Sequence, residues 1–203
     1  MKLYFAPGAC SLSPHIIANE LGLPLTLVKV DTTKKQTADG ADFWAINPKG
    51  YVPAIELDNG QILTEGTAIV QYLADQKPEA KLAPAAGSFE RVRLQEMLGY
   101  INSELHKSYS PLFNPKTPAE TRADREEYLR KRYGLIEKQL AGKEFLFGDQ
   151  FTVADAYLYT VTNWAAYVKL DISAFPNLLA FQARVAARPA VQKALAAEGL
   201  TKH

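Results

Sequence analysis

The sequence predicts two unlike parts, an α/β domain with the element order βαβ-ββα followed by an all-helical bundle. From residue 1 to about residue 77, short apolar runs alternate with short helical patterns, whereas beyond Pro84 the pattern is that of long amphipathic helices. Residues 78–87, PEAKLAPAAG, contain two prolines and several small residues, as linkers often do. We therefore expect domains at residues 1–80 and 87–203.

The composition limits the kinds of partner that the chain can have. Of its 203 residues 47% are hydrophobic, enough for packed cores, and 23 basic against 22 acidic residues leave a formal net charge of +1. This balance offers no excess of positive charge for phosphates, so nucleic acid is not an expected partner. A single cysteine, no leader pattern and no apolar run long enough for a bilayer predict a reduced, cytoplasmic protein without a membrane partner.

The first elements form a predicted βαβ unit. Strands are expected at residues 3–5 and 25–30, with a helix between them. Ser13 suits the N-cap of that helix, and Pro14 suits its first position, where the missing N–H costs nothing. Gly22 suits a left-handed cap at its end. Two parallel strands joined by a right-handed crossover follow from this order.

A hairpin and a second helix complete the α/β domain. Two apolar runs, residues 53–57 and 61–63, flank Asp58-Asn59-Gly60. An Asn-Gly pair between such runs is a strong hairpin signal. Thr64 is then expected to open a helix over residues 65–75.

Cys10 lies shortly before the first predicted helix, in the run ACSLS. Unpaired N–H groups and the positive end of the helix dipole favour a thiolate at this place. Thioredoxin-type proteins carry Cys-x-x-Cys here, but the fourth residue is Ser13, so any disulfide must form with an external thiol. Position alone leaves both a reactive thiol and a buried structural cysteine open.

Five motifs spread over the chain carry a resemblance to a known family. They are YFAPGACS at residues 4–11, NPKGYVP at 47–53, LTEGTAI at 63–69, ELHK at 104–107 and FTVAD at 151–155. Together and in order they closely resemble the glutathione S-transferases of the bacterial beta class. The resemblance implies a thioredoxin-like glutathione-binding domain, a helical domain that contributes a hydrophobic substrate pocket, and a homodimer with two glutathione sites.

The resemblance assigns part of the glutathione site to two short segments. A cis peptide is expected between Val52 and Pro53, so that the main chain of Val52 pairs with the glutathione backbone like an added strand. Free N–H groups at Glu65 and Gly66 suit the γ-glutamyl carboxylate, and the Glu65 side chain suits its ammonium group. Without the resemblance, an ordinary turn and an acid that complements the helix dipole would explain the same residues.

The same domain is expected to supply a lysine that binds glutathione and a group that activates the glutathione thiol. Lys35 resembles the family lysine that reaches the glycyl carboxylate, while Lys34 beside it competes for the assignment and a solvated lysine pair is the ordinary alternative. Cys10 is the expected catalytic residue in this domain, and it also belongs to the glutathione-binding set. Ser11 on the same loop is the alternative group for activating the bound thiol.

The helical domain supplies the remaining candidates. A long helix is expected through residues 92–105, with His106 and Lys107 at its C-terminal end. His106 is the expected acceptor of the glutathione proton, because imidazole titrates near neutrality, and Lys107 could stabilise a thiolate. Both cations would alternatively complement the helix dipole. Since the family uses acidic or amide groups of the neighbouring subunit, the resemblance makes Glu104 a further candidate for a glutathione ligand. Gly99 departs from the relatives that carry a side chain there.

Two other groups of residues need an assignment. Thr152 and Asp155 form a predicted capping box, so Asp155 has a folding role and is not a catalytic acid. The aromatic residues considered for the hydrophobic pocket are Tyr109, Phe113, Trp164 and Tyr167. Because such aromatic stripes are usually core, only Tyr109 and Trp164 are assigned to the pocket.

Glutathione is thus the one expected co-substrate. The three histidines, His15, His106 and His203, have no metal-ligand spacing, and no phosphate-binding loop is present, so neither a metal nor a nucleotide is expected. The main hypothesis is a transferase that conjugates reduced glutathione to electrophilic hydrophobic compounds in detoxification. The alternatives are thiol-disulfide exchange or reductive dehalogenation through a Cys10-glutathione mixed disulfide, and a non-catalytic carrier of hydrophobic ligands.

Overall fold

The computed structural model describes residues 1–201, which fold into two compact units. The first unit combines residues 1–83 with residues 187–201, and the second consists of residues 84–186. The change from one unit to the next falls inside the proline-rich linker segment. The C-terminal residues differ from the expected domain limits, because they group with the α/β unit and not with the helical one.

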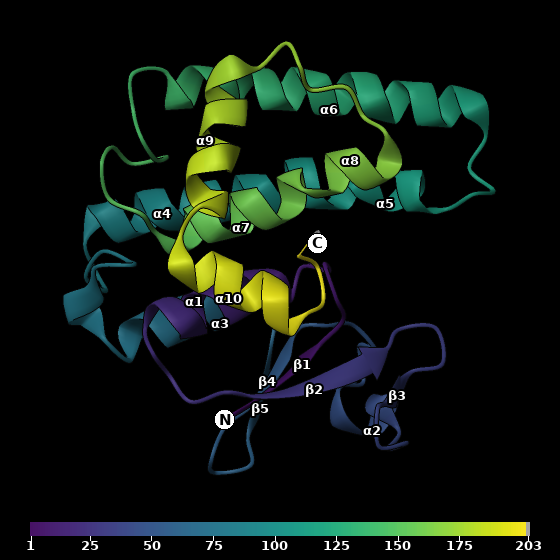
Figure 1. The fold of residues 1–203 in the computed structure, drawn as a ribbon, viewed down its shortest axis with the longest axis vertical. Coiled ribbons are helices and arrows are strands. Elements are labelled where there is room, and N and C mark those ends of the chain that lie inside the picture. Colours follow the sequence, from purple (N-terminus) through teal and green to yellow (C-terminus); the bar gives the residue numbers. More distant parts are fainter. Residues whose placement is uncertain (202–203) are drawn as a thin grey trace. The chain divides into compact units, whose positions relative to one another are not determined.

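A five-stranded mixed sheet forms the centre of the first unit, with the order β3-β2-β1-β4-β5 (Figure 1). The strands are β1 (Lys2–Phe5), β2 (Thr26–Asp31), β3 (Gln36–Thr37), β4 (Ala54–Glu56) and β5 (Ile62–Thr64). β1 and β2 are parallel, and β4 runs antiparallel to β1 and β5. The βαβ unit and the hairpin are as predicted. β3 is an addition, since two residues are too few to show a periodic pattern.

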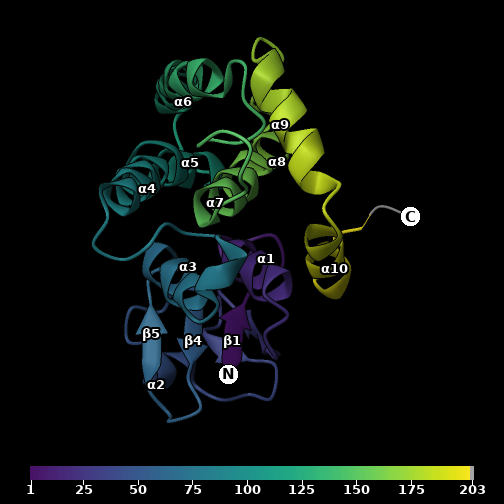
Figure 2. The ribbon, with the colours of Figure 1, turned by 90° about the vertical axis from the view of Figure 1, so that its left-hand side faces the viewer.

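The C-terminal helix packs on the first helix of the same unit. The helices of the unit are α1 (Leu12–Glu20), α2 (Phe43–Ile46), α3 (Gly66–Asp75), the 3-10 turn η1 (Pro78–Ala80) and α10 (Pro189–Ala197). α1 lies between α3 and α10 (Figure 2). The guanidinium of Arg188 pairs with Glu20 at 2.6 Å, and the buried Glu198 carboxylate accepts from the N–H of Gly8 at 2.9 Å. These contacts between distant parts of the chain explain why residues 187–201 group with the α/β unit.

Two helices of this unit begin elsewhere than predicted. α1 begins directly after Ser11, which is its N-cap, and not after Ser13. Pro14 thereby takes the third helical position, where an N–H would still have no intrahelical partner, so proline is tolerated there too. α3 begins at Gly66 and not at Thr64 or the next residue, because Thr64 still pairs with β4.

The second unit is entirely helical. Its elements are α4 (Phe89–Tyr100), the π-helical turn η2 (Ile101–His106), α5 (Lys107–Phe113), α6 (Ala119–Leu140), α7 (Val153–Thr162), α8 (Trp164–Val168) and α9 (Pro176–Ala186). α4, η2 and α5 follow one another without interruption. The predicted helix end at His106 and Lys107 is therefore wrong, and the idea that these two cations complement a helix C-terminus falls with it.

The predicted capping box opens α7. Both of its hydrogen bonds are present, and Asp155 Oδ2 accepts from the Thr152 N–H at 2.8 Å. Asp155 Oδ1 also accepts from the N–H of Leu146 at 2.8 Å. Burial raises the pKa of Asp155 to about 6, against the lowering effect of these hydrogen bonds. The carboxyl group thus joins the start of α7 to the loop before it.

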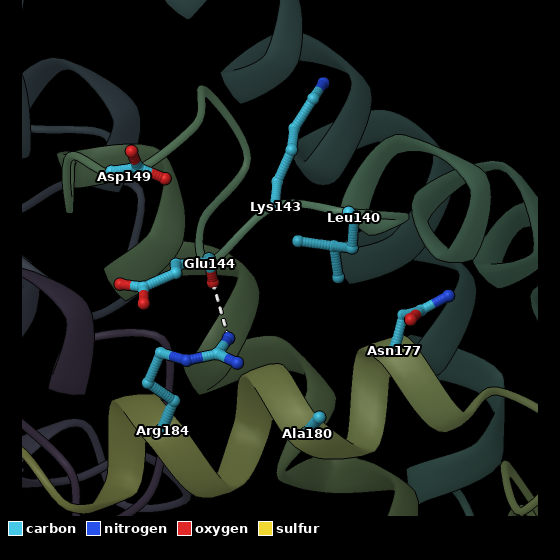
Figure 3. Close-up of a pocket in the computed structure, with 8 residues that line it drawn as sticks. Leu140, Lys143, Glu144, Asp149, Asn177, Ala180 and Arg184 are labelled. Atoms are coloured by element: carbon cyan, nitrogen blue, oxygen red, sulfur yellow. Dashed lines mark hydrogen bonds between the residues drawn. The ribbon is translucent and has the colours of Figure 1, made fainter.

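A pocket of about 330 Å³ opens on the second unit, between the end of α6, the loop after it and α9 (Figure 3). Its lining residues are Leu140, Gly142, Lys143, Glu144, Asp149, Asn177, Ala180 and Arg184. Arg184 donates to the main-chain oxygen of Glu144 at 2.7 Å across it. None of the predicted site residues lines this pocket. No helix within residues 1–201 is long and apolar enough to cross a membrane.

Candidate active site

Cys10 lies in the turn between β1 and α1, directly before the helix N-cap. Its Sγ donates to the main-chain oxygen of Val52 at 3.2 Å, and the side chain is partly exposed. Ser11, the alternative activating group, is fully buried, and its Oγ donates to the carbonyl of Ala6 at 3.2 Å. Of these two side chains, Cys10 is the one that a second thiol can approach.

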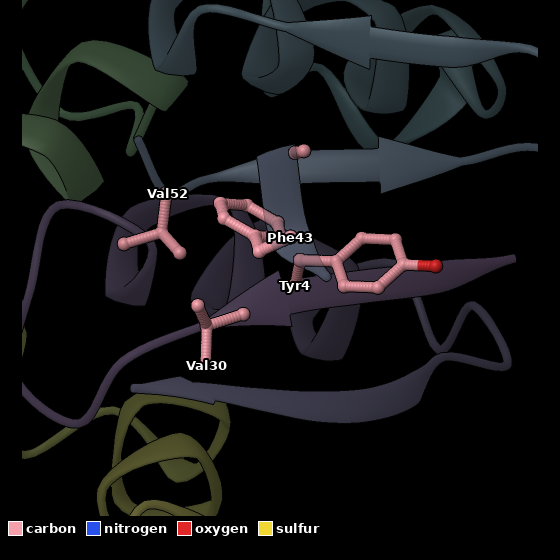
Figure 4. Close-up of a cluster of buried hydrophobic side chains, with 5 residues drawn as sticks. Tyr4, Val30, Phe43 and Val52 are labelled. Atoms are coloured by element: carbon pink, nitrogen blue, oxygen red, sulfur yellow. The ribbon is translucent and has the colours of Figure 1, made fainter. Parts of the chain in front are cut away.

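Val52 lies two residues before β4 and is held by a buried cluster. The cluster consists of Tyr4, Val30, Phe43, Val52 and Ala54 (Figure 4). Within it the rings of Tyr4 and Phe43 lie 5.8 Å apart, so the short helix α2 packs on the strands through one aromatic side chain. The peptide between Val52 and Pro53 is cis, as expected. A main chain held in this way is suited to pairing with an extended peptide.

Glu65 and Gly66 form the start of α3. Glu65 has φ of 69°. Residues other than glycine rarely adopt such positive values, and those that do are often at functional sites. Its exposed carboxylate accepts from Lys49 Nζ at 2.7 Å. A Cβ on Gly66 would lie 3.6 Å from Pro53, an ordinary contact, so packing does not require glycine. The helix start therefore presents a carboxylate that already binds an ammonium group.

Lys35 is anchored by its surroundings, whereas Lys34 is exposed on the same loop. Lys35 Nζ donates to the carbonyl of Gly50 at 2.8 Å and lies 5.6 Å from the ring centres of both Trp44 and Tyr51. Gly50 is needed here, because a Cβ would lie 2.5 Å from the Trp44 ring. The two rings and the carbonyl hold the Lys35 ammonium in one place.

His106 ends the π-helical turn and faces α7 and α8. Its Nδ1 lies 2.6 Å from the phenolic oxygen of Tyr157, and its ring meets that of Trp164 edge to face at 4.8 Å. The Tyr157 hydroxyl in turn donates to Asn102 Oδ1 at 3.0 Å. The imidazole is partly exposed, so it is oriented by its neighbours without being enclosed.

Glu104 lies in a polar cluster with residues of α6. Its carboxylate is 2.8 Å from Arg132 Nε and accepts from the hydroxyl of Tyr128. The hydrogen bond from Tyr128, followed by the charge of Arg132, lowers the pKa of Glu104. Lys107 is exposed at the start of α5. At Gly99 a Cβ would meet nothing within 4 Å, so a side chain would fit there.

Tyr109 and Trp164 lie in a buried aromatic cluster. The hydroxyl of Tyr109 is 2.8 Å from that of Tyr133, and Trp164 meets the rings of Tyr109 and Phe113 edge to face at 5.7 and 5.6 Å. Tyr109 is fully buried and Trp164 is 6% exposed, whereas Phe113 and Tyr167 are 50% and 65% exposed. The aromatic faces open to a ligand in this arrangement are those of Phe113 and Tyr167, which the sequence did not favour.

The histidines do not form a metal site within the described residues. No three side chains of His, Cys, Asp or Glu in residues 1–201 come together as metal ligands do. Nδ1 of the buried His15 is 2.9 Å from a carboxylate oxygen of Glu198. His203 lies outside the described residues.

Each unit brings some predicted residues into contact. Cys10 contacts Val52 in the first unit, and His106 contacts Trp164 in the second. Partners that sequence reasoning missed are Trp44, Lys49, Tyr51, Asn102, Tyr128, Arg132 and Tyr157. Only the NPKGYVP motif, which contains Lys49 and Tyr51, could have drawn attention to any of them, because the others lie outside the five motifs.

Comparison with known proteins identifies the family of the chain. The family model "Glutathione S-transferase, N-terminal domain" matches residues 8–76, and "Glutathione S-transferase, C-terminal domain" matches residues 100–189. Glutathione S-transferase GstA of Escherichia coli O157:H7 is 48% identical over 200 residues, which cover 98% of this chain and 100% of GstA.

Solved structures extend the similarity to the fold. A ternary complex of BphK, a bacterial glutathione S-transferase, is 56% identical with a TM-score of 0.97, over 98% of this chain and 100% of that chain. A sphingomonad glutathione S-transferase complexed with glutathione is 47% identical with a TM-score of 0.95, over 99% and 100% of the two chains. These findings confirm the fold class, a thioredoxin-like domain with a helical domain, and the resemblance to the bacterial beta class. The chain belongs to the glutathione S-transferase family.

Proposed function

We propose that this protein conjugates reduced glutathione to electrophilic, hydrophobic compounds. The observation that carries the proposal is the 3.2 Å contact between Cys10 Sγ and the main-chain oxygen of Val52. A tripeptide backbone that pairs with Val52 like an added strand brings its own cysteine sulfur near Cys10. Glutathione bound to a relative that is 47% identical supports the choice of tripeptide.

The other ends of glutathione find complementary charges in the same unit. The Glu65 carboxylate, which binds the Lys49 ammonium, suits the γ-glutamyl ammonium, and the N–H groups at Gly66 suit the γ-glutamyl carboxylate. The ammonium of Lys35 suits the glycyl carboxylate. Pro53, which follows Val52 through the cis peptide, completes the proposed glutathione-binding set in this segment.

The helical residues complete the proposal. His106 accepts the thiol proton, Lys107 stabilises the thiolate, and Glu104 of one subunit contributes to the glutathione site of the other in a homodimer. We assign the hydrophobic pocket to the helical domain with Tyr109 and Trp164. Both side chains are buried, and both rings pack against the half-exposed Phe113, which supports their place beneath such a pocket. The expected setting is detoxification in the cytoplasm.

A second function is favoured by the partial exposure of Cys10. Attack of its thiolate on oxidised glutathione breaks the S–S bond, forms a Cys10-glutathione disulfide and releases one glutathione thiolate. Intact-mass measurement after incubation with oxidised glutathione tests this step. An adduct on the wild type that is missing from Cys10→Ala supports it, and an unmodified wild type contradicts it. Tight binding of hydrophobic compounds with turnover at the solution rate would instead favour the carrier alternative.

The main proposal is tested by the rate of thioether formation from reduced glutathione and an activated aryl chloride. Acceleration by both the wild type and Cys10→Ala indicates a transferase in which Cys10 serves redox chemistry. Acceleration by the wild type alone makes Cys10 part of conjugation. If neither protein accelerates the reaction, the conjugation proposal is wrong.

A further inference from the structure

Three side chains of the second unit form a hydrogen-bonded chain that ends on the imidazole of His106. Asn102 and His106 lie four residues apart on η2, and Tyr157 lies on α7 opposite them. The Tyr157 hydroxyl donates to Asn102 Oδ1 at 3.0 Å. The phenolic oxygen of Tyr157 also lies 2.6 Å from His106 Nδ1. Tyr157 is 2% exposed, so water has little access to the middle of this chain.

The direction of the phenolic hydrogen decides which imidazole nitrogen is protonated. A phenol has one hydrogen to donate, and its oxygen can also accept. With that hydrogen directed at the carbonyl oxygen of Asn102, the phenolic oxygen accepts from His106 Nδ1, which then carries the N–H. In the neutral imidazole the lone pair then lies on Nε2.

We propose that Asn102 and Tyr157 are positioning residues that hold His106 in the Nδ1–H tautomer and so present Nε2 as the proton acceptor. The catalytic consequence rests on the proposed function. There the S–H bond of glutathione breaks, the proton moves to Nε2, and the electron pair stays on sulfur as the thiolate. The imidazolium that results keeps its Nδ1–H bond to Tyr157, so the hydrogen bond is already in place when the positive charge develops.

Two further features support a positioning role. The π-helical turn brings Asn102 and His106 to the same phenol. Such turns are rare in proteins as a whole, and those that occur are often at functional sites. The ring of Trp164 lies edge to face against the imidazole at 4.8 Å and restricts its rotation. The hydrogen bond and the aromatic contact therefore fix both the tautomer and the orientation of His106.

The sharpest variant is Asn102→Ala in the full-length protein. It keeps Tyr157 and His106 but removes the acceptor, so the phenolic O–H is released to donate to Nδ1 and the proton moves to Nε2. Nitrogen-15 NMR of the imidazole reads the tautomer directly. We expect a protonated Nδ1 in the wild type and a protonated Nε2 in Asn102→Ala. The conservative variant Asn102→Asp keeps an acceptor oxygen and should retain the wild-type tautomer.

Conjugation kinetics provide the second readout. At saturating glutathione, kcat of Asn102→Ala should fall about tenfold or more, as loss of a general base does, while KM for glutathione changes little. Asn102→Asp should recover most of kcat. Tyr159→Phe is the matched control. It removes a hydroxyl from the same buried helix, but that hydroxyl bonds to Asn163 and not to Asn102 or His106. It should change neither the tautomer nor kcat.

The outcomes separate this inference from the proposed function. A wild-type spectrum with the proton on Nε2 overturns the inference, whatever the activity. A shifted tautomer in Asn102→Ala with unchanged kcat also overturns it, because His106 is then not positioned for catalysis. The expected wild-type tautomer in a protein without conjugation activity supports the hydrogen-bond assignment and contradicts the proposed function.

Discussion

Lys35 and Glu65 adopt backbone angles that residues other than glycine rarely take, with φ of 57° and 69°. Such conformations cost about 1–3 kcal/mol each and persist where surrounding contacts hold them. Lys35 is held by the carbonyl of Gly50, whereas Glu65 is held at the start of α3, where its own carbonyl accepts from the N–H groups of Ala68 and Ile69. The Lys35 ammonium is therefore oriented before a ligand arrives, which lowers the ordering cost of binding.

The adjacent lysines allow a direct test of this view at the residue scale. Lys35→Met should raise KM for glutathione about tenfold, because one charge-assisted hydrogen bond to the glycyl carboxylate is lost. Lys34→Met is the control and should leave KM unchanged, since Lys34 is exposed on the same loop. Steady-state kinetics with varied glutathione measures both. Equal effects of the two substitutions would show that only the charge of the loop matters.

At the scale of elements, α10 is tied to the turn that carries the cysteine. The Glu198 carboxylate accepts from the N–H of Gly8 at 2.9 Å and is 2.9 Å from Nδ1 of His15 on α1. Its side chain is buried, whereas the pair of Arg188 with Glu20 is partly exposed. The buried contacts should therefore contribute more to stability than the exposed one.

Replacement of Glu198 by Ala should lower the free energy of unfolding by about 3 kcal/mol, because it removes the carboxylate that the buried His15 imidazole and the partly buried N–H of Gly8 share. Arg188→Ala should cost about 1 kcal/mol or less, as partly exposed ion pairs do. Urea unfolding of both variants gives the comparison. A larger loss in Arg188→Ala than in Glu198→Ala would contradict this account of how α10 is held.

The start of α7 makes stability depend on pH. Burial raises the pKa of Asp155 to about 6, so between pH 4 and 6 the folded state binds a proton that the unfolded state has released. The contribution of Asp155 to stability is therefore complete at low pH and is lost as pH rises through 6. Between pH 5 and 7 the wild type should lose about 1 kcal/mol relative to Asp155→Asn, which does not titrate. Unfolding experiments on both proteins at several pH values measure this. The prediction is contradicted if the free energy of unfolding of the wild type, relative to that of Asp155→Asn, rises with pH.

At the scale of the whole molecule, charge is nearly balanced, with 23 basic and 22 acidic residues. Long-range attraction of an anionic tripeptide is therefore weak, and under the proposed function we expect recognition to depend on single groups such as Lys35 and Glu65. The proposed contribution of Glu104 to a second subunit adds one requirement, which is an assembly of two chains.

Sedimentation equilibrium should give a mass of twice the 22.4 kDa of the chain. Glu104→Gln should then raise KM for glutathione without changing this mass, since it removes a charge and keeps the size of the side chain. A monomer with full conjugation activity would contradict the homodimer and the role of Glu104 together. The thioether assay described above, run across the concentration range of dissociation, supplies the activity.

Local signals predicted the parts of the fold whose causes are local. The Asn59-Gly60 hairpin and the capping box of Thr152 and Asp155 act over a few residues, and both are present. Prediction failed where a local signal had two solutions. Pro14 fits any position of the first helical turn, so it did not mark the start of α1. Prediction also failed where there was no local signal. The π-helical turn before Lys107 has none, and the helix continues through this turn into α5, beyond its predicted end.

For this chain, motif order and short-range chemistry determined the family, the βαβ-ββα order and the location of Cys10, because turn, cap and helix-start preferences are properties of neighbouring residues. Tertiary structure alone decided that α10 joins the α/β unit, that Lys35 is held in place beside an exposed Lys34, and that Tyr109 is buried. The physical reason is that burial, ring packing and hydrogen bonding between distant residues depend on which surfaces meet, and a pattern within one segment does not contain its partner.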